Sequence, residues 1–208
     1  MKEISARQQR RISSIALRSF MVLRTLWRPL LLAGAGILLS GCLLVRTTEQ
    51  RITLNANGSG EAYMRLTDIR SDGTTDSIRT RDFGIMMASA DSEGVQEFEQ
   101  EGRKILSKHF LVSGDTLSME LTYSFPRFES VEGLKRTDEE IFVVVKEGRE
   151  IVKTNGKIQS WENDTRRIVW PTNAKRLMFQ IAETSLPPST SLAALYHRYY
   201  SSPGGRTP

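Results

Sequence analysis

Hydrophobic and polar residues alternate along much of the chain, and the alternation is clearest in residues 116–125. Every second position there is hydrophobic, and the positions between are polar: Leu117, Met119, Leu121, Tyr123 and Phe125 alternate with Ser118, Glu120, Thr122 and Ser124. This period predicts a β-strand with one face in a core and the other in water. Residues 104–112 and the turn 113–115 come just before it, which predicts a hairpin.

The same pattern predicts strands on both sides of this hairpin. Residues 50–55 and 61–68 flank a turn rich in glycine and asparagine, which predicts a second hairpin. The continuous hydrophobic run 141–145 predicts a central strand covered on both faces. Four later strands are expected at 150–154, 157–161, 166–170 and 176–182. Asn155-Gly156 predicts a tight hairpin between the first two of these, so we expect one mostly antiparallel sheet of about seven to nine strands.

Helical patterns are fewer. Hydrophobic residues between positions 83 and 101 predict one broken helix or two short ones, with Ser92 beginning the second and Gly102 ending it. Residues 69–81 are polar and follow neither period, which predicts a surface loop. Near the C-terminus, helical spacing puts four residues on one face: Leu192, Leu195, Tyr196 and Tyr199. This short helix could pack on its own domain, or offer an interaction surface to a partner or a lipid layer.

Together these elements predict an α+β domain, mostly antiparallel β-sheet with a minority of short helices. A segment of a different kind precedes it. Residues 30–39 carry no charged side chain, and seven basic residues against one acidic residue come before Cys42. A basic stretch followed by a short hydrophobic run is typical of a secretory signal peptide, and the run is shorter than the ~20 residues of a transmembrane helix. The alternatives are a single-pass signal anchor extending to Val45 and a cysteine that is simply a small core residue.

Leu39-Ser40-Gly41-Cys42 resembles the lipobox of bacterial lipoproteins, and Cys42 is the chain's only cysteine. The resemblance implies that signal peptidase recognises Leu39, Ser40 and Gly41. It also implies that Cys42 receives a diacylglycerol and an acyl chain, with no other cofactor. Leu43 stands where an aspartate would signal retention in the inner membrane, so the resemblance implies the outer membrane in a host that has two.

The expected organisation follows from these boundaries. Residues 1–41 are the signal peptide, within which Met21 offers a second start. Residues 42–50 are the lipidated N-terminus and a polar tether, and 51–184 are the α+β domain. Residues 185–208 are a proline-rich linker, the short amphipathic helix and a loose tail.

Two stretches of the mature chain also resemble LppM-like lipoproteins. They are the 54–60 turn and residues 151–170, which contain Asn155-Gly156-Lys157-Ile158 and Ile168-Val169-Trp170. The resemblance rests on hairpins of a common kind. It implies a membrane-tethered domain with affinity for envelope lipids or glycolipids, and it assigns no catalytic residue.

The net charge changes once the signal peptide is set aside. The full chain has 29 basic and 24 acidic residues, of which 7 and 1 precede Cys42, leaving 22 against 23. A nearly neutral domain argues against nucleic acid as a partner, because such binding depends on a basic surface. The local pair Arg166-Arg167 is expected to be a solvated strand end.

Candidate catalytic groups are sparse. The two histidines, His109 and His197, form no metal-ligand motif, so neither a catalytic nor a metal site is expected. Asp72, Asp76 and Asp82 could line a loop site in a membrane-tethered hydrolase, which is the alternative function class. Trp161 and Trp170 could form a surface on which sugars stack, or pack in the core. We therefore expect a non-catalytic, lipid-anchored envelope protein that binds a protein partner or an envelope lipid or glycan.

Overall fold

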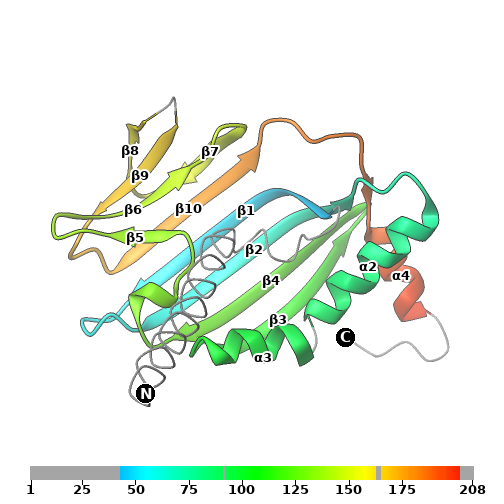
Figure 1. The fold of residues 1–208 in the computed structure, drawn as a ribbon, viewed down its shortest axis with the longest axis horizontal. Coiled ribbons are helices and arrows are strands. Elements are labelled where there is room, and N and C mark those ends of the chain that lie inside the picture. Colours follow the sequence, from blue (N-terminus) through cyan, green and yellow to red (C-terminus); the bar gives the residue numbers. More distant parts are fainter. Residues whose placement is uncertain (1–42, 91, 163–164, 202–208) are drawn as a thin grey trace, which may run out of the picture. The chain divides into compact units, whose positions relative to one another are not determined.

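The computed structural model describes residues 43–90, 92–162 and 165–201. Within these ranges the chain forms two antiparallel β-sheets and three α-helices, so the α+β class and the predominance of antiparallel sheet are confirmed (Figure 1). The predicted single sheet is wrong, because the strands divide between two sheets. The residues that resemble a lipobox, Leu39, Ser40, Gly41 and Cys42, lie outside the described residues.

The first sheet has the strand order β3-β4-β2-β1-β10-β7, and a short strand, β11, pairs with the end of β2. Both predicted hairpins of the N-terminal half are present, since β1 pairs with β2 and β3 with β4. The strands of this sheet are β1 (Leu43–Leu54), β2 (Gly60–Ser71), β3 (Lys104–Ser113), β4 (Thr116–Phe125), β7 (Arg149–Thr154), β10 (Arg176–Glu183) and β11 (Thr190–Ser191).

The second sheet has the order β5-β6-β9-β8. Its strands are β5 (Leu134–Arg136), β6 (Glu140–Val145), β8 (Lys157–Ser160) and β9 (Arg166–Pro171). The hydrophobic run 141–145 is an inner strand as predicted, with consecutive residues Ile141, Phe142 and Val143 all buried. Burial of residues on both faces explains why this strand lacks polar alternation.

The helices are α2 (Asp76–Ala90), α3 (Ser92–Gln100) and α4 (Ala193–Ser201), with a 3₁₀ turn at Phe128–Ser130. Two helices therefore occupy the predicted helical region, and Gly102 ends the second in a left-handed conformation, with φ of +78°. Its N–H donates to the carbonyl of Glu99, and Arg103 N–H to that of Phe98, which satisfies the last carbonyls of the helix. The loop predicted at 69–81 is wrong, because β2 runs to Ser71 and α2 begins at Asp76.

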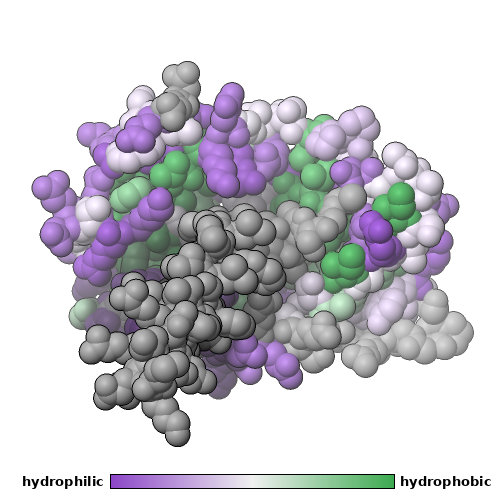
Figure 2. All heavy atoms as spheres, in the orientation of Figure 1, coloured by the Kyte–Doolittle hydropathy of each residue, from purple (hydrophilic) through white to green (hydrophobic). Residues whose placement is uncertain are grey.

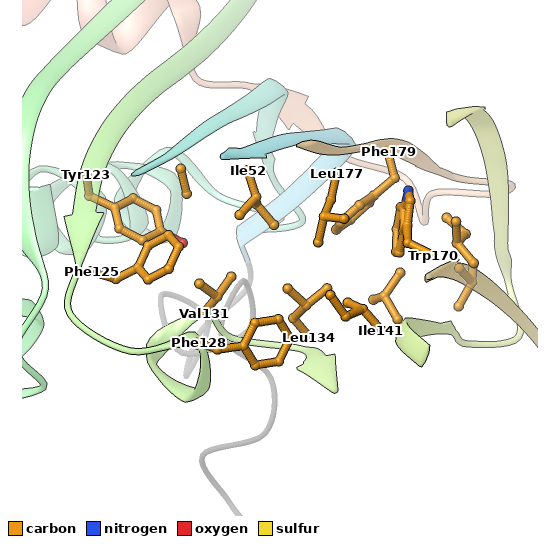
Figure 3. Close-up of a cluster of buried hydrophobic side chains, with 14 of the residues drawn as sticks. Ile52, Tyr123, Phe125, Phe128, Val131, Leu134, Ile141, Trp170, Leu177 and Phe179 are labelled. Atoms are coloured by element: carbon orange, nitrogen blue, oxygen red, sulfur yellow. The ribbon is translucent and has the colours of Figure 1, made fainter. Parts of the chain in front are cut away.

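The larger core cluster fills the space between the two sheets (Figure 3). Side chains of the first sheet, among them Ile52 and Phe179, meet Ile141 and Trp170 of the second. Phe128 and Val131, between β4 and β5, close one side of the cluster. Burial of this many large apolar side chains is the main stabilising term available to a domain without a disulfide.

The second core cluster joins the first sheet to α2 and α4. Leu66 and Ile69 of β2 both belong to it, although strand alternation would put residues three apart on opposite faces. Asp68 lies between them with φ of +60°, a left-handed conformation that is uncommon outside glycine. This local irregularity breaks the alternation, so that both hydrophobic side chains reach the cluster that contains Phe83 and Tyr196.

The domain extends beyond both predicted boundaries. Residues 43–50, expected as a tether, are the first part of β1 and pair along β2 from Leu43 opposite Ser71. Pairing of the whole segment with β2, pairing of residues 47–50 with β10 and the burial of Leu43 explain why these residues belong to the sheet. Residues 185–208 were expected to be a proline-rich linker, a short amphipathic helix and a loose tail outside the domain. Instead β11 pairs with β2, and Leu192, just before the helix, is fully buried.

The prediction of a hairpin at Asn155-Gly156 is also wrong. The strand before this pair, β7, bonds to β10 in the first sheet, and the strand after it, β8, bonds to β9 in the second. The dipeptide is thus the corner at which the chain changes sheets. Gly156 fits there because a Cβ atom would lie 2.6 Å from both Ile168 Cγ2 and Trp170 Cε2.

The side chain of Asn155 connects the two sheets at this corner. Its Oδ1 accepts hydrogen bonds from Trp170 Nε1 of β9 (2.7 Å) and from the Met178 N–H of β10 (2.8 Å). Its Nδ2 donates to the carbonyl of Arg176, also in β10 (3.0 Å). Both polar atoms of this amide therefore bond to β9 or β10.

Asn155→Ala is expected to lower the free energy of unfolding by about 1–3 kcal/mol, because it leaves the N–H of the buried Trp170 without an acceptor, whereas the Met178 N–H, in an exposed hydrogen bond, can bond to water. Urea unfolding followed by tryptophan fluorescence measures this loss. Asn57→Ala is the matched control: Asn57 also precedes a glycine, but it bonds only within its exposed turn, to Ser59. A loss of about 1 kcal/mol or less is expected there. Equal losses in the two variants would contradict the bridging role of Asn155.

Candidate functional site

The first described residue, Leu43, lies at one end of the first sheet. Its side chain is only 4% exposed and belongs to the cluster shared with α2 and α4. It pairs with Ser71, which pairs in turn with Thr190 of β11. We call this end of the sheet, formed by Leu43, Ser71, Thr190 and the segment 72–75, the β1 start. The residue expected to be lipidated, Cys42, is joined directly to it.

Arginine side chains hold the β1 start together. Arg70 donates from Nη2 to the carbonyl of Ser189 (2.7 Å) and pairs with Asp68, which also bonds Arg46 Nε (2.8 Å). Arg79 of α2 donates to the carbonyl of Gly73 and to the hydroxyl of Thr190, both at 3.3 Å. These hydrogen bonds and ion pairs connect β2, α2 and β11. They cross-link the end of the sheet next to the cluster that it shares with α2 and α4.

The three carboxylates proposed for a hydrolase do not share one environment. Asp76 is exposed at the start of α2 and pairs with Arg79. Asp82 is buried, and its Oδ2 accepts a hydrogen bond of 2.6 Å from the Ser71 hydroxyl. Asp72 is partly exposed beyond the end of β2. Across the described ranges, no group of three or more His, Cys, Asp or Glu residues is placed to hold a metal ion.

The C-terminal helix forms as the sequence predicts, but it packs on its own domain. Leu192 and Tyr196, proposed as part of an interaction surface, are buried in the cluster with Phe83. Leu195 is partly buried, and Tyr199, 39% exposed, lies 5.8 Å from the ring of Phe83. Of the two predicted alternatives, packing on its own domain is therefore confirmed for Leu192 and Tyr196. The interaction surface is wrong for these two residues, because they cover the sheet.

The two tryptophans lie on opposite faces of the second sheet. Trp170 is 2% exposed within the core cluster, whereas Trp161 is 37% exposed. The guanidinium of Arg167 lies 4.1 Å from the Trp161 ring centroid and also bonds Gln159 and Glu140. The expectation that Arg167 is a solvated strand end is thus wrong, since its side chain is mostly covered. Sequence reasoning missed this cluster, although the alternation of β9 puts Arg167 and Val169 on the face opposite Trp170.

The face of the first sheet that points away from both core clusters is charged. Glu49, Arg65, Glu120 and His109 are successive neighbours across β1, β2, β4 and β3. Acidic and basic residues alternate along this row, and Arg65 pairs with Glu120 at 3.6 Å. Arg51 lies over the ring of Tyr63 in the next row. We call these residues the charged row; it is polar but nearly neutral.

A partly buried ionisable cluster lies where α3 joins β3. Burial raises the pKa of Tyr123 to about 12 and also raises the pKa of Glu132, while Arg103 opposes both shifts. Glu132 Oε1 and Arg103 Nε are buried without a hydrogen-bond partner among the described residues. Arg103 also stacks on Phe98 and pairs with Glu101. No sequence pattern predicts this cluster, because its members come from three separate segments.

Comparison of the chain with known protein families, characterised proteins and solved structures finds no match. The resemblance to lipoproteins therefore rests on the residues quoted for it. Within the described ranges, no helix is both long and apolar enough to span a bilayer.

Tyr196→Ala is expected to lower the free energy of unfolding by about 3 kcal/mol, because it removes a buried aromatic ring from the cluster beneath α4. Tyr199→Ala, three residues along the same helix, should lower it by about 1 kcal/mol or less, as for a partly exposed side chain. Chemical denaturation of both variants measures the difference. Small and equal effects would show that α4 does not stabilise the domain.

Glu132→Gln is expected to stabilise the protein at neutral pH. The folded-state pKa of Glu132 is raised, so the folded protein holds its proton to higher pH than the unfolded chain, and stability falls as pH rises through that window. Denaturation of wild type and variant at pH 7 and at about pH 4, near the ordinary pKa of glutamate, tests this. The variant should gain stability only at pH 7. Glu129→Gln, at an exposed glutamate nearby, is the control, and an equal gain in both variants would contradict the prediction.

Proposed function

We propose that this chain is a lipid-anchored protein of the bacterial cell envelope and that its domain binds a partner rather than catalysing a reaction. One observation carries the proposal: the chain's only cysteine follows an uncharged run and two small residues, and the next residue begins the first strand of the domain. A signal peptide ending at Gly41 would leave Cys42 as the new N-terminus. The charge and hydrophobicity that this segment adds to the whole chain would then be absent from the mature protein.

The covalent lipid supplies the membrane affinity. Diacylglycerol on the Cys42 sulfur, and an acyl chain on its amine, give two or more hydrocarbon chains. A single chain binds membranes only marginally, whereas two anchor stably. Leu43 in place of aspartate favours the outer membrane in a host with two membranes.

Two surfaces of the domain support a binding role. The charged row gives an ordered array of alternating charges, which suits a polar protein surface better than an apolar ligand. Trp161, with Arg167 and Gln159 beside it, gives a smaller aromatic and polar surface suited to an envelope glycan or lipid headgroup. A hydrolase is less well supported, because Asp76 and Asp82 face different environments.

Incorporation of radiolabelled palmitate tests the anchor. Wild type should be labelled and should sediment with membranes. Cys42→Ala should carry no label and keep the mass of the uncleaved precursor, because the acyl acceptor is absent. Ser40→Ala keeps a small residue two positions before the cysteine and should still be labelled, which makes it the matched control. A membrane-bound wild-type chain of precursor mass without acyl groups would instead identify a signal anchor.

A further inference from the structure

We propose that the β1 start faces the phospholipid headgroups directly, so that the domain stands on the bilayer with the β1–β2 turn pointing away. This orientation rests on the proposed lipidation of Cys42. It specifies which surface of the domain meets the membrane and which surfaces stay free for a partner.

No spacer separates the proposed anchor residue, Cys42, from the first strand of the domain. The Cα atoms of Cys42 and Leu43 are ~3.8 Å apart, as in any trans peptide. Leu43 is already buried and paired in the sheet. A flexible tether over 42–50 would have let the domain move up to ~30 Å from the anchor. Because β1 occupies those residues, that freedom is lost and the β1 start must stay at the membrane surface.

The β3–β4 turn lies at the same end of the sheet. Thr47, Thr67 and Ser118 are neighbours across β1, β2 and β4. From this row, β1 runs four residues to Leu43 and β4 runs three residues to Asp115, or ~13 Å and ~10 Å at the usual rise per residue. Asp115 is exposed at the tip of that turn. The turn is thus expected near the headgroups with the β1 start.

The chemistry of this end suits headgroups rather than acyl chains. Thr74 and Thr75 are exposed between β2 and α2, and Arg46 is about half exposed. Hydrogen bonds from Arg70 to Ser189 and from Arg79 to Gly73 and Thr190 hold the backbone around them. A polar, cross-linked end can rest at the interface without burying unpaired groups in hydrocarbon.

The free face of the first sheet argues against a domain lying flat. A sheet face in contact with lipid would need apolar side chains, but the charged row crosses this face with ion pairs. In the parts of Figure 2 that are not grey, the hydrophobic residues form separate spots among hydrophilic ones. When the domain stands on the β1 start, the charged row faces sideways from the membrane and is accessible to a partner.

Energy transfer to the membrane surface tests the orientation. Lipidation uses the only native cysteine, so a donor dye can be attached to single new cysteines in the lipidated full-length protein. The variants Thr74→Cys and Asp115→Cys probe the near end, and Ala56→Cys probes the exposed β1–β2 turn. The proteins are reconstituted in vesicles of phosphatidylethanolamine and phosphatidylglycerol that carry an acceptor dye on the headgroup. Quenching at positions 74 and 115 should exceed that at 56 by roughly twofold or more, since β1 separates the two ends by ~36 Å.

A spacer variant is the matched control. Twelve Gly/Ser residues inserted between Cys42 and Leu43 add a flexible coil with a root-mean-square length of ~20 Å, so quenching at positions 74 and 115 should fall toward that at 56. Equal or reversed quenching in acylated, vesicle-bound protein without the spacer would overturn the orientation and leave the anchor intact. A chain without acyl mass that does not float with vesicles would overturn both.

Discussion

The contact between Trp170 and Asn155 fixes the corner at which the two sheets of this domain meet over their shared hydrophobic core. Three strands meet there, because Asn155 follows β7, Trp170 lies in β9, and the main chain of β10 bonds both polar groups of the amide. Gly156 lets the chain pass close to the indole, and the cluster between the sheets begins beside it. If this corner opened, the inner face of the second sheet would lose its cover, since apart from Phe128, Val131 and partly buried residues the cluster is made by the two sheets alone.

The first sheet is covered by two different partners along its length. One end packs against the second sheet, and the other packs against α2 and α4, with Met64 contacting both clusters. Ala62, Met64 and Leu66 reach the two clusters by ordinary strand alternation, and the left-handed residue Asp68 lets Ile69 join the second cluster as well. This division orders the whole of β1, including the residues that join the proposed anchor. If Cys42 is lipidated as proposed, the domain is attached rigidly rather than loosely.

Some of the candidate sites could be predicted from the sequence, and others could not. The lipobox-like residues are contiguous, so their pattern is visible in the sequence without a structure. Arg167, Trp161 and Glu140 come from separate strands and loops, and so do Arg103 and Glu132. Their proximity depends on strand pairing and helix packing, which no local pattern specifies. The four residues assigned to a docking face had the right helical spacing, but the spacing does not say that the domain itself covers the face.

Local patterns were enough to find most strands, two hairpins, α3, α4 and the second half of α2, because alternation, turn residues and helical spacing act within a few residues of one another. Strand partners were decided only by the tertiary structure. The two Asn-Gly pairs show the difference: Asn57-Gly58 closes a hairpin, whereas Asn155-Gly156 carries the chain between sheets. The same dipeptide does both, because its backbone preference allows a sharp change of direction and only distant contacts, here Trp170 and β10, select which strand comes next.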